Sequence, residues 1–179
     1  MSKSHIAFFI RTFILCVLCF CNSIRGHAQE KNYKAYSVYV YNFIKYIEWP
    51  EESKKGDFVI AIIGNSPISA ELKTLAATKK AGGQTIVIKQ FATVAEVDNC
   101  QILYISAGKS GVLKEAIEKT KNMSALMIAE REGLAKKGAG INFVTLEDET
   151  LKFEVNKKVI EAHNLKIPKV LFSLGLVVG

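Results

Sequence analysis

Three apolar runs, separated by stretches with helical features, restrict the fold of this chain more than any other part of its sequence. These runs lie at 57–64, 100–106 and 124–130. Each is apolar at successive positions, so both faces of the strand need cover, as in a parallel sheet. Helical segments are expected at 66–78, where Ser66 and Pro67 suit a helix start, and at 109–121. The alternation predicts a three-layer α/β sandwich, Rossmann-like, with a mostly parallel central sheet and helices on both faces.

The remaining segments extend this sheet and its cover. A Gly-Gly turn precedes a further strand at 82–90, and two alternating runs around a polar turn at 140–156 predict a C-terminal antiparallel hairpin. Asn156 is suited to cap a short helix after the hairpin, and the apolar end of the chain predicts one more helix. With no repeat and no linker, we predict a single domain over 29–179.

The stretch "YNFIKYIEWP" lies in a predicted amphipathic helix. Its apolar positions recur at spacings of three and four, which places them on one face of a helix. They are Tyr33, Tyr36, Val40, Phe43, Ile44 and Ile47. Pro50 disfavours helical geometry at the residue before it, so the helix should end near Glu48.

A second stripe, formed by Tyr39, Asn42, Tyr46 and Trp49, lies beside the first. One interpretation is structural: the helix is deeply buried, Asn42 bonds backbone groups, and Trp49 closes the end of the core. The other is functional: these four residues line a cleft or a docking surface for a partner or ligand. The sequence leaves both open, and the four residues are the candidate site.

The first 28 residues resemble a cleaved secretory signal peptide. Lys3 and Arg11 give it a positive start, the apolar run at 13–20 is too short to span a bilayer, and small residues precede a cleavage point before Gln29. A lipoprotein signal is the alternative, but none of its cysteines follows the small residue that lipid attachment needs. We therefore expect an exported, periplasmic chain.

Loss of the signal peptide removes Lys3, Arg11 and Arg25, which lowers the formal net charge from +7 to +4. The other lysines are scattered, which favours a solvated surface over nucleic-acid binding. Cys100 becomes the single cysteine, so no internal disulfide can form. Its place before an apolar strand favours a buried thiol over an exposed one that links two chains.

No set of residues resembles a catalytic or cofactor site. His163 is the single histidine after processing, too few for the usual metal ligands, and it is expected at a helix end. The tripeptide "GKS" at 108–110 lacks the glycine that a phosphate loop needs at Leu103. We therefore expect a protein that is not an enzyme and that has no metal or cofactor.

Three motifs in order resemble the YfiR-like family of periplasmic proteins. They are "YNFIKYIEWP", "LMIAEREGLAKKGAGINFV" and "LKFEVN" followed by "LKIPKVLFSLGLVV". The resemblance extends over about 33–178. It implies a non-enzymatic regulator that binds and represses an inner-membrane signalling protein, such as a diguanylate cyclase that controls cyclic di-GMP and biofilm, or a sensor kinase. It also implies an outer-membrane lipoprotein as a further partner. The cysteine pair of some members is absent.

Two further expectations concern binding. The alternative function is that of a periplasmic small-ligand-binding protein, with its ligand at the carboxyl ends of the parallel strands near Asn65, Ser106 and Gly108. The second aromatic stripe also gives the domain apolar surface to bury, so we expect a homodimer.

Overall fold

The computed structural model describes residues 31–179, and the predicted signal peptide at 1–28 lies outside them. Residues Asn32–Gly179 form one compact unit. Its helices are α2 (Tyr33–Tyr46), α3 (Ile68–Ala76), α4 (Leu113–Thr120), α5 (Lys157–Ala162) and α6 (Lys169–Leu174), with 3-10 turns η1 (Glu51–Lys54), η2 (Ala107–Val112) and η3 (Ala135–Lys137). Its strands are β1 (Phe58–Ile63), β2 (Lys80–Ala81), β3 (Gln84–Phe91), β4 (Ile102–Ile105), β5 (Leu126–Ala129), β6 (Ile141–Thr145), β7 (Leu151–Val155) and β8 (Leu176–Val177).

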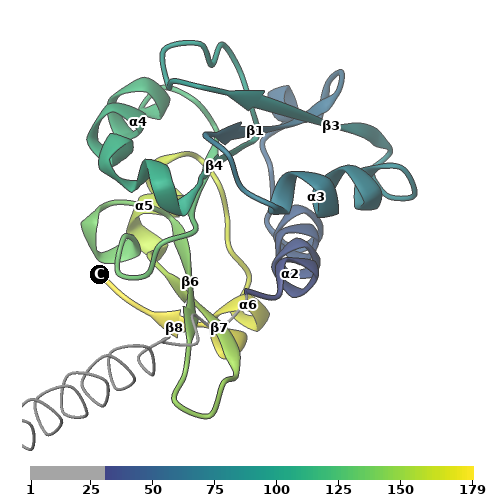
Figure 1. Cartoon of the computed structure of the whole chain (residues 1–179). Coiled ribbons are helices and arrows are strands. Elements are labelled where there is room, and N and C mark those ends of the chain that lie inside the picture. Colours follow the sequence, from purple (N-terminus) through teal and green to yellow (C-terminus); the bar gives the residue numbers. More distant parts are fainter. Residues whose placement is uncertain (1–30) are drawn as a thin grey trace, which may run out of the picture. The chain divides into compact units, whose positions relative to one another are not determined.

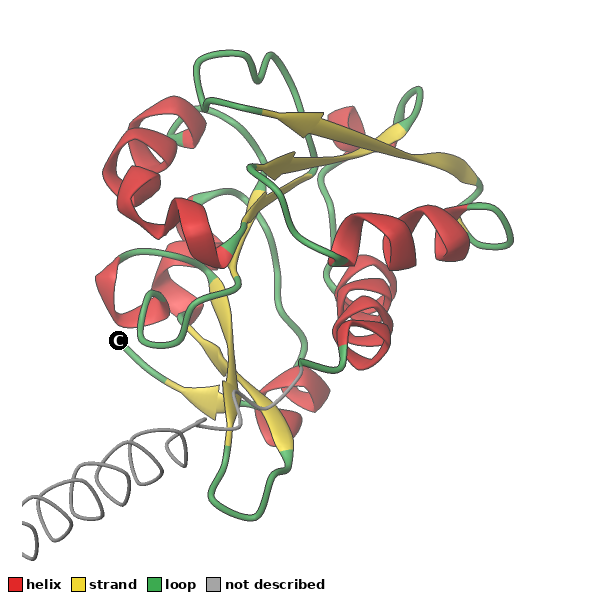
Figure 2. Ribbon diagram, viewed as in Figure 1, coloured by secondary structure: helices red, strands yellow, loops and turns green. Residues whose placement is uncertain are grey.

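The eight strands form one mixed sheet in the order β2-β3-β1-β4-β5-β6-β7-β8. The central strands, in the spatial order β3, β1, β4, β5 and β6, run parallel to one another. At one end β7 pairs antiparallel with β6 and parallel with β8, and at the other β2 pairs antiparallel with β3. Figure 2 shows this twisted sheet in yellow among red helices. The predicted α/β sandwich with a C-terminal hairpin is confirmed.

Two apolar clusters cover the two faces of the sheet. Phe58, Ile60 and Ile62 of β1 belong to the cluster that includes residues of α2, α3 and α6. Ala61 and Ile63, which alternate with them, belong to the cluster with α4 and the loops before β4 and after β5. Figure 1 shows α4 on one side of the central strands and α2 with α3 on the other. The apolar runs of the sequence are therefore buried on both faces, as predicted.

The structure differs from the prediction in a few local features. Strands β2 and β8 have two residues each, too short to leave a periodic pattern, and neither was predicted. The helix expected from 109 begins as η2 and becomes α-helical only at Leu113, because glycines such as Gly111 disfavour an α-helix. Pro67 takes the cap position of α3, one residue later than expected.

Helix α2 confirms the predicted core face. Asn32 caps its start by accepting a hydrogen bond from the Ala35 amide at 3.0 Å. Val40 and Phe43 are fully buried, and the Phe43 ring meets Phe153 edge-on at a centroid distance of 5.0 Å. The helix ends as Ile47 becomes extended, in agreement with the expected effect of Pro50.

Candidate functional site

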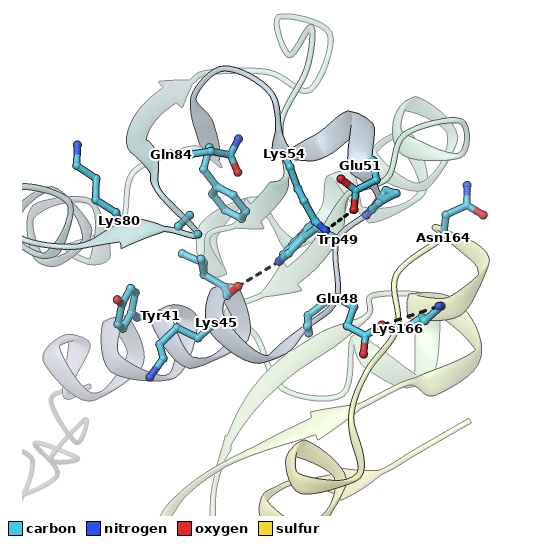
Figure 3. Close-up of a pocket in the computed structure, with 16 residues that line it drawn as sticks. Tyr41, Lys45, Glu48, Trp49, Glu51, Lys54, Lys80, Gln84, Asn164 and Lys166 are labelled. Atoms are coloured by element: carbon cyan, nitrogen blue, oxygen red, sulfur yellow. Dashed lines mark hydrogen bonds and ion pairs between the residues drawn. The ribbon is translucent and has the colours of Figure 1, made fainter.

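A groove of about 780 Å³ lies beside the C-terminal half of α2 (Figure 3). Its lining comes from three parts of the chain that are distant in sequence. They are the segment from α2 to the start of β1, the strands β2 and β3 where the turn joins them, and the loop between α5 and α6. The groove therefore depends on the fold, and no single sequence motif encodes it.

Trp49 lines the groove and is held by the end of α2. Its Nε1 donates a hydrogen bond to the Ile44 carbonyl at 3.2 Å, which satisfies a carbonyl in the last turn of the helix. Its ring meets Phe58 of β1 at 90°, with centroids 5.0 Å apart. The side chain is 9% exposed, so it belongs to the core and also presents one edge to the groove.

A short backbone bridge fixes the side of the groove nearest the C-terminal helices. The Glu48 amide donates to the Lys166 carbonyl at 2.9 Å, and the Lys166 amide donates to the Glu48 carbonyl at 3.2 Å. Asn164, next to this bridge, has the left-handed φ of 59° that asparagine tolerates after a helix. The loop after α5 is thereby tied to the end of α2.

The rim of the groove carries more positive than negative charge. Four lysines and two glutamates line it: Lys45, Lys54, Lys80, Lys166, Glu48 and Glu51. Both glutamates have a lysine partner, at 2.6 Å for Lys54–Glu51 and 3.9 Å for Lys166–Glu48. Lys45 and Lys80 form no ion pair with any residue of 31–179. The surplus charge thus lies with these two lysines.

Lys45 and Lys80 lie toward the end of the groove where Tyr41 also lies (Figure 3). The Lys45 Nζ is 5.9 Å from the ring centroid of Tyr41 and 5.1 Å from that of Tyr46, within range of a cation–π interaction. Lys80 donates to the Thr85 hydroxyl at 3.1 Å. The opposite end holds Asn164 and the Glu48–Lys166 pair. One end of the groove is therefore cationic and aromatic.

The four residues of the predicted stripe do not form one exposed surface. Trp49 lines the groove. Tyr46 is 44% exposed, and its ring lies 5.1 Å from the Nζ of Lys45, which also lines the groove. Tyr39 instead packs between Phe43 and the hairpin, and its hydroxyl donates to the Leu151 carbonyl at 3.0 Å. Asn42 is half-buried. A contact role for the stripe stays a prediction, and its geometry favours the Tyr46–Trp49 end.

A second polar site lies at the carboxyl ends of the parallel strands, where the ligand of the alternative function was expected. Glu130, which follows β5, is 4% exposed. Its Oε1 accepts a hydrogen bond from the Tyr33 hydroxyl at 2.7 Å, and its Oε2 accepts one from the Ala107 amide at 3.3 Å. This carboxylate therefore joins the start of α2 to the loop after β4.

Two hydroxyls near Glu130 are buried without a hydrogen-bond partner within residues 31–179. They are the Tyr104 Oη and the Ser106 Oγ. Burial and the charge of Glu130 raise the pKa of Tyr104 well above its usual value. Burial, the hydrogen bond to Glu130 and the charge of Glu130 raise the pKa of Tyr33 to about 12. Of the loop residues predicted here, Ser106 is buried, whereas Asn65 and Gly108 are exposed.

Cys100 and His163, the other residues weighed in the sequence, have structural roles. Cys100 is buried, and burial raises the pKa of its thiol to about 12, as expected of a structural cysteine. His163 ends α5, as predicted, with its Nδ1 2.9 Å from the Met123 carbonyl. No group of three metal-ligating side chains comes together in residues 31–179.

Sequence reasoning found Trp49 but missed the lysines of the groove and Glu130. The lysines lie on separate elements, so nothing in their spacing marks them as one set. Glu130 left a weak signal, as a charged residue at the end of an apolar strand. Such a residue lies where open α/β sheets bind ligands, and it could have been singled out on that ground.

Comparison with known proteins agrees with the motifs. The model of the YfiR/HmsC-like family matches residues 33–175. A search of curated proteins found no match. Among solved structures, an ABC domain in complex with L-Trp from Streptococcus pneumonia matches with 10% identity and a TM-score of 0.49. The match covers 68% of this chain and 55% of that one, so this chain spans about half its length, and so weak a likeness says nothing of function.

The fold and the family match together define the class of protein. It is an α/β domain of a family of periplasmic regulatory proteins that interact with signalling partners and are not enzymes. The chain belongs to the YfiR/HmsC-like family. Within residues 31–179, no helix has the length and apolar character needed to cross a bilayer.

Proposed function

We propose that this chain is a periplasmic, non-enzymatic regulator that binds and represses an inner-membrane signalling protein. The observation that carries the proposal is the family match over residues 33–175. The partner would be a diguanylate cyclase that controls cyclic di-GMP and biofilm, or a sensor kinase, and an outer-membrane lipoprotein would sequester the regulator. Export by the predicted signal peptide at 1–28 would bring the domain to the periplasm.

The groove beside Trp49 is the contact surface that we propose for the signalling partner. It combines an apolar lining, a solvent-exposed aromatic neighbour in Tyr46 and charged groups on its rim. Protein interfaces commonly have this composition, with aromatic anchors at the centre and polar groups around them. The predicted residues Tyr46 and Trp49 would then act together, while Tyr39 would support the helix that carries them.

A gene deletion tests the regulatory role. We expect a strain without the gene to show raised cyclic di-GMP or altered kinase output, restored by the wild-type gene. The extracytoplasmic part of a membrane signalling protein encoded next to the gene should co-purify with the processed chain. Unchanged cyclic di-GMP and kinase output in the deletion strain would contradict the proposed function.

A homodimer is part of this proposal, and the exposed edge of β8 supports it. Four large apolar side chains lie exposed within one short stretch: Val170, Leu174, Leu176 and Val177. An edge strand with apolar neighbours offers unpaired backbone groups to a second copy. Light scattering should give the dimer mass at tens of micromolar, and Val177→Lys with Leu174→Glu should shift it to the monomer. A monomeric wild-type chain would contradict this assembly.

The alternative function, small-ligand binding, is favoured by one observation. The Tyr104 and Ser106 hydroxyls are buried without partners within residues 31–179, at the carboxyl ends of the strands. Buried polar groups usually find a partner, and a ligand hydroxyl or amide would supply one. A thermal-shift screen with amino acids and nucleotides should then find a ligand that raises the melting temperature of the wild type. The same ligand should raise the melting temperature of Ser106→Ala by a smaller amount. No shift across the screen would count against this function.

A further inference from the structure

The charge on the groove is unevenly compensated. Glu48 and Glu51 already have lysine partners, whereas Lys45 and Lys80 have no carboxylate partner in the described part of the chain. All four lysines of the rim are exposed. The amines of Lys45 and Lys80 extend in different directions at the Tyr41 end of the groove (Figure 3). A segment with more than one carboxylate that entered this end would therefore find two separate cations without having to displace an existing ion pair.

The lining of the groove is apolar where the rim is charged. Ile44, Ile47, Trp49 and Phe58 contribute to it, and Tyr41 adds an aromatic face beside Lys45. A volume of about 780 Å³ is in the range that holds a short segment or a few side chains. A small inorganic anion would use the lysines but not the apolar lining. A segment with both acidic and apolar side chains would use both.

We infer that the groove binds an acidic segment of the signalling partner, with its carboxylates at Lys45 and Lys80 and an apolar or aromatic side chain against Trp49. The inference rests on the proposed function, in that it takes the occupant to be a protein partner. Lysine and carboxylate at an exposed rim mainly set the specificity and the rate of association, while the buried aromatic contact holds the complex. Binding should accordingly weaken as salt screens the rim.

Trp49 provides a reporter for the test, because it is the only tryptophan of the chain. The processed chain, from Gln29 to Gly179, is titrated with a peptide in which aspartates and glutamates flank one phenylalanine. A matched peptide carries asparagine and glutamine at the acidic positions. We expect a saturable change in Trp49 fluorescence with the acidic peptide and at least tenfold weaker binding of the matched one.

Charge-reversal variants locate the contact. Lys45→Glu with Lys80→Glu should weaken binding of the acidic peptide at least tenfold. The control, Lys114→Glu with Lys137→Glu, makes the same change in net charge at exposed lysines of α4 and η3, and it should bind like the wild type. Equal losses in the two variants, equal binding of the two peptides, or no binding of either would overturn the inference. Displacement of the peptide by inorganic phosphate at matched ionic strength would also overturn the inference, because the groove would then be a site for a small anion.

A partner experiment separates failure of this inference from failure of the proposed function. If the extracytoplasmic part of the signalling protein binds the wild type and the Lys45→Glu, Lys80→Glu variant equally, the acidic contact is wrong and the regulatory role stands. If deletion of the gene leaves signalling output unchanged, the regulatory role fails whether or not the acidic peptide binds. The inference is supported only when the partner, like the peptide, binds the double variant at least tenfold more weakly.

Discussion

The two ends of helix α2 meet the rest of the molecule in opposite ways. At its start, the Tyr33 hydroxyl is bonded to the buried Glu130 carboxylate at 2.7 Å, beside hydroxyls that are fully enclosed. At its end, Trp49 borders a groove whose charged groups are exposed. Buried polar groups are costly to disturb, whereas exposed charges contribute little to stability and remain available to a partner. The comparison favours a structural role for the first end, and it supports the contact role that we propose for the second.

Phe43, near the C-terminal end of α2, should show the largest effect because it is a fully buried aromatic residue on the core face of the helix. Its side chain is fully buried against Phe143 and Phe153. We expect Phe43→Ala to lower the free energy of unfolding by about 3 to 5 kcal/mol, the usual range for a buried phenylalanine. Urea unfolding followed by circular dichroism measures this. Val38→Ala, at a position 52% exposed on the same helix, is the control and should change stability by less than about 0.5 kcal/mol. A small loss in Phe43→Ala would mean that α2 is not anchored through its core face.

Tyr39 should show the next largest effect, since it belongs to the predicted second stripe but packs on the hairpin. We expect Tyr39→Ala to cost about 2 to 4 kcal/mol, because it loses the contacts with Phe43 and Phe153. Tyr39→Phe removes only the bond to the Leu151 carbonyl and should cost about 0.5 to 1.5 kcal/mol. If Tyr39→Ala were as stable as the wild type but weakened partner binding, the contact surface would include this residue.

The fate of this stripe shows how far the sequence could predict the molecule. Successive apolar residues and a proline are local signals, so the sheet, α2 and its end near Glu48 could be predicted. Spacing could also place Tyr39 beside the core face of α2, whereas Trp49, predicted in the same stripe, lies beyond the end of the helix. It could not separate their roles, because that depends on the neighbours each one meets, the hairpin for Tyr39 and the groove for Trp49. The groove unites segments whose contact is set by tertiary packing, which no local pattern encodes.

Tyr33 tests the start of α2, where we expect a smaller effect on stability. We expect Tyr33→Phe to lower stability at neutral pH by about 1 to 2 kcal/mol, since the lost bond is to a carboxylate but is only partly buried. The pKa of Tyr33 is raised from 10.0 to about 12, so the folded state holds this proton more tightly than the unfolded state. Its contribution is fully present below pH 10 and is lost as the pH rises toward 12. The gap between wild type and Tyr33→Phe in urea unfolding should therefore narrow over that interval. A gap that stays constant would mean that the hydroxyl of Tyr33 is not bonded to Glu130 in solution.

The groove lysines Lys45 and Lys80, near the end of α2, should have the smallest effect on stability. This result decides how their binding data are interpreted. Lys45 and Lys80 are exposed and form no ion pair within residues 31–179, so their reversal removes two cation–π contacts and one weak hydrogen bond. We expect Lys45→Glu with Lys80→Glu to change the free energy of unfolding by less than about 1 kcal/mol, because such contacts at exposed sites are weak. Urea unfolding of this variant beside Lys114→Glu with Lys137→Glu gives the comparison at equal net charge. If the groove variant alone lost several kcal/mol, Lys45 and Lys80 would support the fold as Tyr33 does. Any loss of partner binding would then follow from a disturbed α2, and the two ends of the helix would no longer differ in kind.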